Sequence, residues 1–194
     1  NAKCLLFVEY DEKIDIIEKN LKLINSGKII QKLSRNSDMN EWWKHRDASL
    51  HYSLKSIKKE MRTPHIIEDA AVPLEKITNL FSTLKKIEKK YQIKMVIYGH
   101  IGNGNMHVRL IMEKNKKKLI KNIVIEYFNN IIENKGTISA EHGDGLARSE
   151  FIKQQYGEKN FQTFKKIKHL MDPNNILNPG KIISKKSTMI KNLK

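Results

Sequence analysis

Two glycine-rich segments of this chain carry residue types that could do metal chemistry. In the first, residues 99–107, His100 and His107 flank a Gly-Asn-Gly turn. In the second, Glu141 is followed directly by His142. Two imidazoles and a carboxylate are ligands of zinc, manganese or iron sites that keep open positions. Because such a metal lowers the pKa of a bound hydroxyl, the histidine beside the ligand set is a candidate general base.

The two histidines must be brought together by the elements around them, and residues 94–100 and 106–112 predict a β-hairpin. In one straight strand His100 and His107 would point to opposite faces, but the glycine turn folds one back beside the other. If they pair across the hairpin, their Cβ atoms lie within about 5 Å, close enough to share a divalent ion. Arg109 shares the face of His107, where its guanidinium could grip a carboxylate. The alternative is that each histidine is an ordinary turn or core residue.

The remaining patterns predict an α+β protein. Helical spacing of apolar residues, with cap and breaker residues, indicates helices over 11–26, 37–58, 73–91, 119–132, 146–156 and 159–171. Short apolar runs indicate strands over 4–10, 28–33, 66–72 and 137–141. This order predicts a ferredoxin-like antiparallel sheet with helices on one face, followed by a C-terminal helical segment, in a single domain over residues 1–194.

The composition excludes several classes of protein. The 194 residues include one cysteine, Cys4, which excludes an internal disulfide and a cysteine-built metal cluster and favours a reducing cytoplasm. No run of about 18 apolar residues could form a membrane-spanning helix. The chain lacks an initiator Met and begins almost directly in a strand-like run, so we expect it to be a fragment of a longer protein.

The formal net charge of +16 suggests an anionic partner, which could be nucleic acid, acidic lipid headgroups or a docking surface. The lysines are spread along the chain, however, and aromatic residues do not alternate with them as they do on single-strand-binding surfaces. We therefore do not expect nucleic acid as a partner. A peripheral contact with the inner face of a membrane stays open.

Several short motifs follow one another along the chain. They are Trp-x-x-Arg at 43–46, Glu-Asp-x-x-Val-Pro at 68–73, Gly-His-x-Gly-Asn-Gly-Asn-x-His at 99–107, Glu-His-Gly-Asp-Gly-x-x-Arg at 141–148, and Asp-Pro with Leu-Asn-Pro-Gly-Lys at 172–181. Together they resemble the C-terminal, substrate-side domain of FAD-linked oxidases of the vanillyl-alcohol-oxidase type, in the branch of D-lactate, glycolate and D-2-hydroxyglutarate dehydrogenases. Asn103 stands where that family has Asp, and we expect little effect from this change in a turn.

The resemblance implies a flavin-dependent D-2-hydroxyacid dehydrogenase that oxidises its substrate to a 2-keto acid by hydride transfer to FAD. His100, His107 and Glu141 match the ligands of a divalent metal, which would be zinc, manganese or iron. His142 matches the base that deprotonates the substrate hydroxyl.

The resemblance also implies substrate and flavin contacts. Arg46 matches the arginine that holds the substrate carboxylate, and Asn178 matches a residue that contacts the flavin. We add Arg148 as a second carboxylate contact, with Arg109 behind it. Relatives that act on 2-hydroxyglutarate carry a lysine shortly before the Val-Pro step, where this chain reads His-Ile-Ile-Glu at 65–68. The missing lysine favours D-lactate or glycolate as the substrate.

The family's FAD-binding domain precedes the substrate domain, and nothing in this sequence corresponds to it. We therefore expect FAD to be held mainly by a domain supplied in cis or in trans, with an iron–sulfur module as a candidate electron acceptor. Two alternatives remain for this chain. One is a stand-alone metal-dependent hydrolase, and the other is a basic module that binds nucleic acid or membrane.

Overall fold

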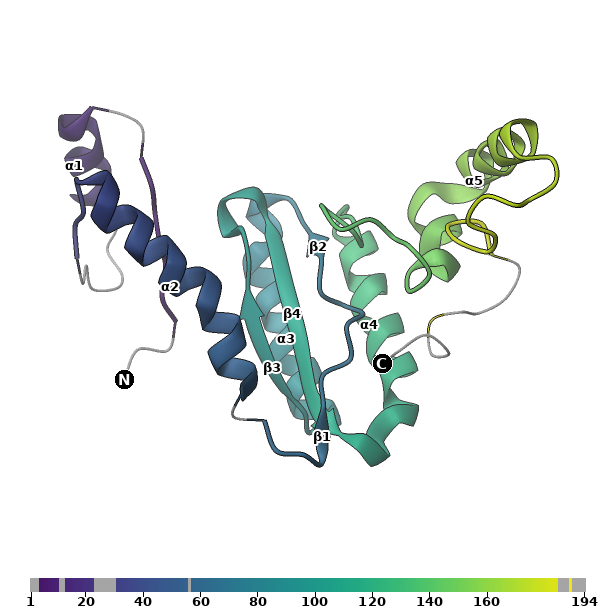
Figure 1. The fold of residues 1–194 in the computed structure, drawn as a ribbon, viewed down its shortest axis with the longest axis horizontal. Coiled ribbons are helices and arrows are strands. Elements are labelled where there is room, and N and C mark those ends of the chain that lie inside the picture. The colour runs from purple at the N-terminus through teal and green to yellow at the C-terminus, as the bar shows by residue number, and fades with distance from the viewer. Residues whose placement is uncertain (1–3, 11–12, 23–30, 56, 185–188, 190–194) are drawn as a thin grey trace. The chain divides into compact units, whose positions relative to one another are not determined.

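The computed structural model describes residues 4–10, 13–22, 31–55, 57–184 and 189 (Figure 1). Contacts within the chain divide it into two units, residues 1–48 and 49–194, and each is described by itself. The single domain expected over 1–194 stays a prediction.

The first unit contains α1 (Ile14–Lys22) and most of α2 (Asn36–Lys55). Both helices lie within the predicted ranges, apart from one extra residue at the start of α2, and the predicted stop of the first at Gly27 falls outside the described residues. The strand predicted at 4–10 is wrong, because this segment pairs with no strand among the described residues and its backbone is irregular. It is anchored by side chains instead: the Phe7 ring lies 5.7 Å from Trp42, and the Trp43 indole donates to Glu9. The strand predicted at 28–33 lies partly outside the described residues, and 31–33 are irregular.

A small antiparallel sheet is the centre of the second unit. It consists of β1 (Met61–Arg62), β2 (Ala70–Ala71), β3 (Lys94–Tyr98) and β4 (Asn105–Glu113). β4 is the central strand: β3 pairs with it on one side, while β1 and β2 pair with its two ends (Figure 1). The predicted hairpin of β3 and β4 is confirmed, whereas the strand predicted at 66–72 shortens to two residues.

The turn of this hairpin needs glycine for a steric reason. Gly104 has φ +70°, and its carbonyl accepts a hydrogen bond from the Val72 N–H at 3.1 Å. A Cβ atom at this position would lie 1.9 Å from the Val72 carbonyl oxygen. The turn is therefore closed directly against the segment that follows β2, which fixes the start of β4.

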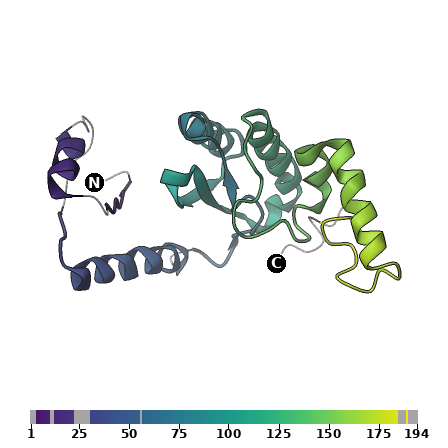
Figure 2. The same cartoon turned by 90° about the horizontal axis from the view of Figure 1, so that it is seen from above.

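Two helices cover one face of the sheet. They are α3 (Ile77–Tyr91), entered through a short 3-10 turn after Pro73, and α4 (Ile120–Glu133), and they pack side by side (Figure 2). The core between helices and sheet contains Leu80, Leu84, Ile87, Val108, Leu110, Met112, Ile123, Val124, Tyr127, Phe128 and Ile131. The predicted α+β class with an antiparallel sheet and helices on one face is thus confirmed.

The C-terminal part of the second unit is helical, as predicted, but its boundaries differ. One helix, α5 (Ile152–Met171), contains a break at Gly157, the glycine expected to separate two helices. Before it, residues 146–148 form a turn and Ser149–Phe151 a short 3-10 helix, where the first α-helical turns were predicted. Asp172 ends α5 before Pro173. No helix among the described residues is both long and apolar enough to cross a membrane.

Candidate metal and catalytic site

The structure brings the predicted ligand residues together around one carboxylate oxygen. Glu141 Oε1 lies 2.9 Å from His107 Nε2 and 3.5 Å from His100 Nε2. The rings of His100 and His107 are 5.5 Å apart and nearly perpendicular. The geometry differs from the predicted one in one respect: His107 pairs across the hairpin with Tyr98, while His100 follows the end of β3. The three side chains form a donor set suited to a divalent cation, and their role as ligands stays a prediction.

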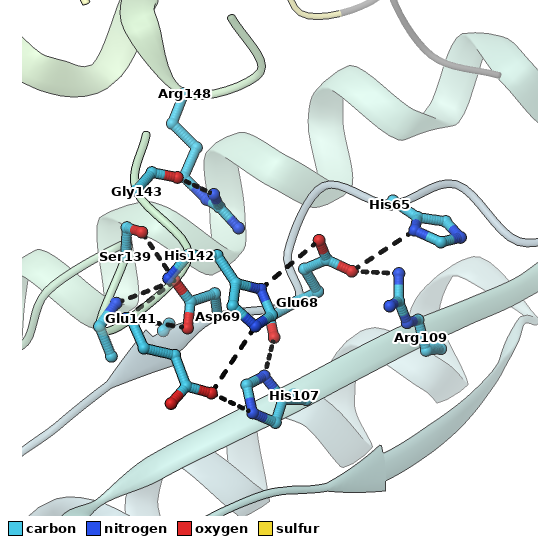
Figure 3. A network of polar contacts seen from close by, with 12 residues as sticks. His65, Glu68, Asp69, His107, Arg109, Ser139, Glu141, His142, Gly143 and Arg148 are labelled. Carbon is cyan, nitrogen blue, oxygen red and sulfur yellow. Dashed lines mark hydrogen bonds and ion pairs between the residues drawn. The ribbon is translucent and has the colours of Figure 1, made fainter. Parts of the chain in front are cut away.

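His142, the predicted base, borders the same oxygen. Its Nε2 lies 3.6 Å from Glu141 Oε1, and its ring stacks on His107 with centroids 5.1 Å apart and an interplanar angle of 11° (Figure 3). A base in this position faces whatever binds beside Glu141 and His107. The arrangement therefore fits the predicted proton-transfer role of His142.

His107 is oriented by a backbone carbonyl. Its side chain is almost completely buried, and Nδ1 lies 2.7 Å from the carbonyl oxygen of Glu68. Because a carbonyl can only accept, Nδ1 carries the proton and Nε2 is directed at Glu141. In the neutral ring, Nε2 and the carboxylate oxygen are both acceptors, so a second ring proton or a cation must satisfy them. Carbonyl-fixed histidines of this kind are typical of metal sites.

The site also contains a buried carboxylate to which sequence reasoning assigned no role. Asp69 is fully buried, and its Oδ2 accepts hydrogen bonds from the Ser139 hydroxyl at 2.7 Å and from the N–H groups of Ala140, Glu141 and His142 at 3.0, 3.2 and 2.9 Å. These donors explain why the strand predicted at 137–141 is wrong. Beyond one bridge at Thr137, the N–H of Ile138 donates to the Gln155 side chain, and those of Ala140 and Glu141 donate to Asp69 instead of a neighbouring strand. The only sequence signal for Asp69 is its place in the Glu-Asp-x-x-Val-Pro motif.

Two combinations of residues in this cluster could hold a cation. Asp69, His107, Glu141 and His142 each offer a ligand atom, all within 4.8 Å of one another, whereas the predicted set has His100 in place of Asp69 and His142. Burial raises the pKa of the Asp69 carboxyl, but hydrogen bonds from Ser139 and the neighbouring N–H groups outweigh burial and lower it below its usual range. Because its hydrogen bonds occupy Asp69 so fully, we retain the predicted set and regard Asp69 as the support of the loop.

Glu68 connects the cluster to Arg109. One carboxylate oxygen of Glu68 contacts the Arg109 guanidinium and lies 3.6 Å from His65 Nδ1, and the other lies 3.8 Å from His142 Nδ1 (Figure 3). Arg109 occupies the predicted face of β4, but it is 9% exposed and its charge is met by Glu68. A buried guanidinium that is already paired is poorly suited to grip a second carboxylate. Its substrate contact stays a prediction without support from this geometry.

The other predicted contacts lie in different surroundings. Arg148 is buried and donates from Nη1 to the Gly143 carbonyl at 2.7 Å, so it braces the loop that carries His142. Burial raises the pKa of Asp144 in the same loop, although the charge of Arg148 opposes the shift. Arg46 lies on α2 in the first unit, 3.0 Å from the Asp47 carboxylate. Asn178 lies exposed in the loop after α5, where its side-chain oxygen accepts from Lys181 at 3.0 Å. The substrate and flavin roles of these residues stay predictions.

The rim of the site is open. The side chains of His100, Glu141 and His142 are 45%, 46% and 44% exposed, while His107 beneath them is 4% exposed. Reactions that must exclude water need such a rim to be covered. In the described residues of the second unit, the candidate site is therefore open to solvent at its rim and buried at His107.

Comparison with known proteins agrees with the motifs. The chain matches the family described as FAD linked oxidases, C-terminal domain, over residues 1–182. It is 29% identical to the glycolate oxidase subunit GlcD of Bacillus subtilis over 191 residues, which cover 95% of this chain and 40% of the relative. The mitochondrial D-lactate dehydrogenase [cytochrome] of Kluyveromyces lactis is 28% identical over 172 residues, covering 88% and 30%. A probable mitochondrial D-2-hydroxyglutarate dehydrogenase of Oryza sativa subsp. japonica is 30% identical over 164 residues, covering 83% and 27%. The chain spans less than half the length of these relatives.

Proposed function

Because the chain belongs to the family of C-terminal domains of FAD-linked oxidases, we propose that it forms the substrate side of an FAD-dependent dehydrogenase of D-2-hydroxy acids. The observation that carries this proposal is the convergence of His100, His107 and His142 on one oxygen of Glu141. A candidate ligand set with a free imidazole alongside suits the oxidation of an alcohol that stands next to a carboxylate. The relatives are named for glycolate, D-lactate and D-2-hydroxyglutarate, all of them 2-hydroxy acids.

Each residue of the site has a proposed role. His100, His107 and Glu141 would hold a zinc, manganese or iron ion, which would supply positive charge for the substrate hydroxyl and carboxylate. FAD, when bound, supplies the acceptor for the hydride that leaves the α-carbon. His142 takes the hydroxyl proton on Nε2, which faces the Glu141 side of the ring. Asp69 holds the backbone of Glu141 and His142 in place for these roles.

The other predicted contacts, the substrate and the partners complete the proposal. Arg46 holds the substrate carboxylate, Arg148 makes a second contact to that carboxylate, and Asn178 contacts FAD. A short monocarboxylic acid such as D-lactate or glycolate is the preferred substrate, because residues 65–68 offer no lysine for a second carboxylate. The open rim would be covered by an FAD-binding domain supplied in cis or in trans. An iron–sulfur acceptor module, a cytoplasmic location and a peripheral contact with the membrane's inner face extend the proposal.

The test combines this chain with its FAD-binding part and follows oxidation of D-lactate and glycolate with an artificial electron acceptor. Replacing His142 by Ala should lower turnover about 100-fold or more, the usual contribution of a positioned base, while metal content stays at the wild-type level. His169, exposed near the end of α5, provides the matched control, and H169A should keep full activity. Normal turnover in H142A would remove it from the mechanism. Metal-dependent hydrolysis by the chain without any flavin part would support the hydrolase alternative instead.

A further inference from the structure

We infer that Ser149 is a positioning residue that ties residues 178–182, in the segment after α5, to the loop that follows His142. The inference rests on the proposed function, which places the base at the start of that loop and the flavin contact, Asn178, in that segment. Ser149 directly follows the Glu-His-Gly-Asp-Gly-x-x-Arg motif, and the proposed function gives it no task.

Three consecutive carbonyls of this loop accept hydrogen bonds from the residues at its end. Arg148 donates from Nη1 to the Gly143 carbonyl at 2.7 Å (Figure 3), and its backbone N–H donates to the Asp144 carbonyl at 3.0 Å. The Ser149 hydroxyl donates to the Gly145 carbonyl at 2.5 Å. The loop is therefore closed on itself, and Ser149 makes the last of these contacts.

The same hydroxyl also binds the segment after α5. Its oxygen accepts a hydrogen bond from the Ile182 N–H at 2.8 Å, and the Gly145 carbonyl lies 3.4 Å from the same N–H. A serine hydroxyl has one proton to donate and lone pairs that accept, so this side chain serves both segments at once. Ser149 is 3% exposed, so water has little access to either bond. The hydroxyl thus bridges two parts of the chain that lie 33 residues apart.

The backbone of Ile182 shows that the segment is held against its own preference. Ile182 has φ +62°, in the left-handed region that a β-branched residue rarely adopts. The Ile183 N–H donates to the Lys181 carbonyl at 2.6 Å, which closes a tight turn around Ile182. The Ile182 side chain is 36% exposed, so it is not locked in the core. The bond from its N–H to the buried Ser149 hydroxyl supplies the constraint that such a conformation needs.

A tie at this point sets the flavin contact and the base relative to one another. Asn178 lies four residues before Ile182, and its carbonyl accepts a hydrogen bond from the Lys181 N–H at 3.3 Å. His142 begins the loop that Ser149 closes. Reacting atoms must lie about 3–3.5 Å apart, and a shift of about 1 Å can lower a rate roughly 100-fold. Ser149 therefore acts on the reaction through the two segments and without touching the reacting atoms.

Ser149→Ala tests the bridge in the 194-residue chain, with amide hydrogen exchange followed by NMR. Without the hydroxyl, the long bond to the Gly145 carbonyl remains for the Ile182 N–H, so this amide should exchange about 10-fold faster. The matched control is Thr163→Ala. The Thr163 hydroxyl also donates to a backbone carbonyl, that of Lys159 at 3.1 Å, but on the exposed surface of α5. T163A should leave the exchange of Ile182 within about 2-fold of the wild type.

Two variants on the other side of the bridge test the coupling. Ile182→Pro removes the N–H and cannot adopt a positive φ, so it should release the segment and speed exchange of the Arg148 N–H in the loop by about 3-fold. Ile182→Gly keeps the N–H and adopts a positive φ readily, so it should leave the exchange of Arg148 at the wild-type rate. Faster exchange of Arg148 in both variants, or in neither, would contradict the coupling.

Kinetics of the chain combined with its FAD-binding part provide the second readout. S149A should lower kcat roughly 10-fold and change KM less than about 2-fold, because the tie affects the alignment for hydride transfer more than the binding of substrate. Metal and FAD content should not change. Rapid mixing with D-lactate should show the same fall in the rate of flavin reduction, which separates this step from binding and product release. The double variant of S149A with I182P should lose no more activity than the more damaging single variant, because both changes break the same bridge.

Two results would overturn the inference. One is wild-type exchange of the Ile182 amide in S149A, and the other is a normal rate of flavin reduction in S149A although that amide exchanges faster. If the wild-type enzyme oxidises no 2-hydroxy acid, the proposed function fails, whereas the exchange measurements still decide whether Ser149 joins the two segments.

Discussion

Replacing Asp69 should loosen the loop that carries Glu141 and His142 in a graded way. Four donors converge on Asp69 Oδ2, three of them within 3.0 Å. A hydrogen bond to an ionised acceptor stabilises by about 1.5–3 kcal/mol, so three would give an upper bound of roughly 4.5–9 kcal/mol. The loop can open and expose its N–H groups to water, which limits the loss. We therefore expect D69A to lower the free energy of unfolding by about 4 kcal/mol.

Two milder variants separate charge from geometry. Asp69→Asn can place its amide oxygen where Oδ2 lies and keep all four donors, but each bond becomes neutral and about half as strong, giving a loss of roughly 2 kcal/mol. Ser139→Ala removes one donor and should cost about 1 kcal/mol. Zinc affinity should follow the same order, falling about 100-fold in D69A and about 10-fold in D69N, as supporting residues of metal sites do.

Urea unfolding followed by circular dichroism gives the stability, and isothermal titration with zinc gives the affinity. Asp15→Asn, an exposed change on α1, sets the background for both measurements. If D69A unfolds within about 1 kcal/mol of the wild type and binds zinc equally well, the loop is held by something other than Asp69.

Two further predictions concern the turn and the end of α5. Gly104→Ala should lower the free energy of unfolding, measured by urea titration, by roughly 3–5 kcal/mol. The added Cβ would collide with the Val72 carbonyl, and residue 104 has a positive φ that alanine disfavours. The control is Gly102→Ala, which should be nearly neutral because no atom lies within 4 Å of the added Cβ. The Lys168 ammonium and two backbone N–H groups hold the pKa of Asp172 below its usual range. Its stabilising contribution is therefore complete above the unfolded-state pKa, near 3.9, and is lost as the pH falls through the lower folded-state pKa. Acid-stable protease should cut the segment after α5 faster near pH 2 than near pH 5 in the wild type, and D172N should reduce this pH dependence.

Much of the second unit could be predicted because its signals are local. The helices over 77–91 and 120–133 follow from apolar residues that recur at helical spacing, and the hairpin follows from alternation on either side of a glycine turn. Pro73 and Asp172 mark a helix start and a helix end within one or two turns of the chain. The motif residues at 99–107 and 141–148 could likewise be recognised from residue type and spacing alone.

The failures share one cause, which is that the pairing of a segment depends on residues far away in the sequence. The apolar run at 4–10 has the composition of a strand but no neighbour to pair with among the described residues. The run at 137–141 has a better partner than a strand, because the Ser139 hydroxyl and the N–H groups of Ala140 and Glu141 donate to the Asp69 carboxylate about 70 residues earlier. Arg109 lies on the expected face, but only the fold reveals that Glu68 already neutralises it.

The sequence by itself thus determined the types of chemical group, the helices, the hairpin and the glycine that closes its turn, since each depends on neighbours within a few residues. Only the tertiary structure decided which nitrogen of His107 carries the proton, that Asp69 holds the Glu141 loop, and that Glu68 faces His142. The physical reason is that hydrogen bonds and ion pairs act over about 3–4 Å. Their partners are therefore fixed by how distant segments pack against one another.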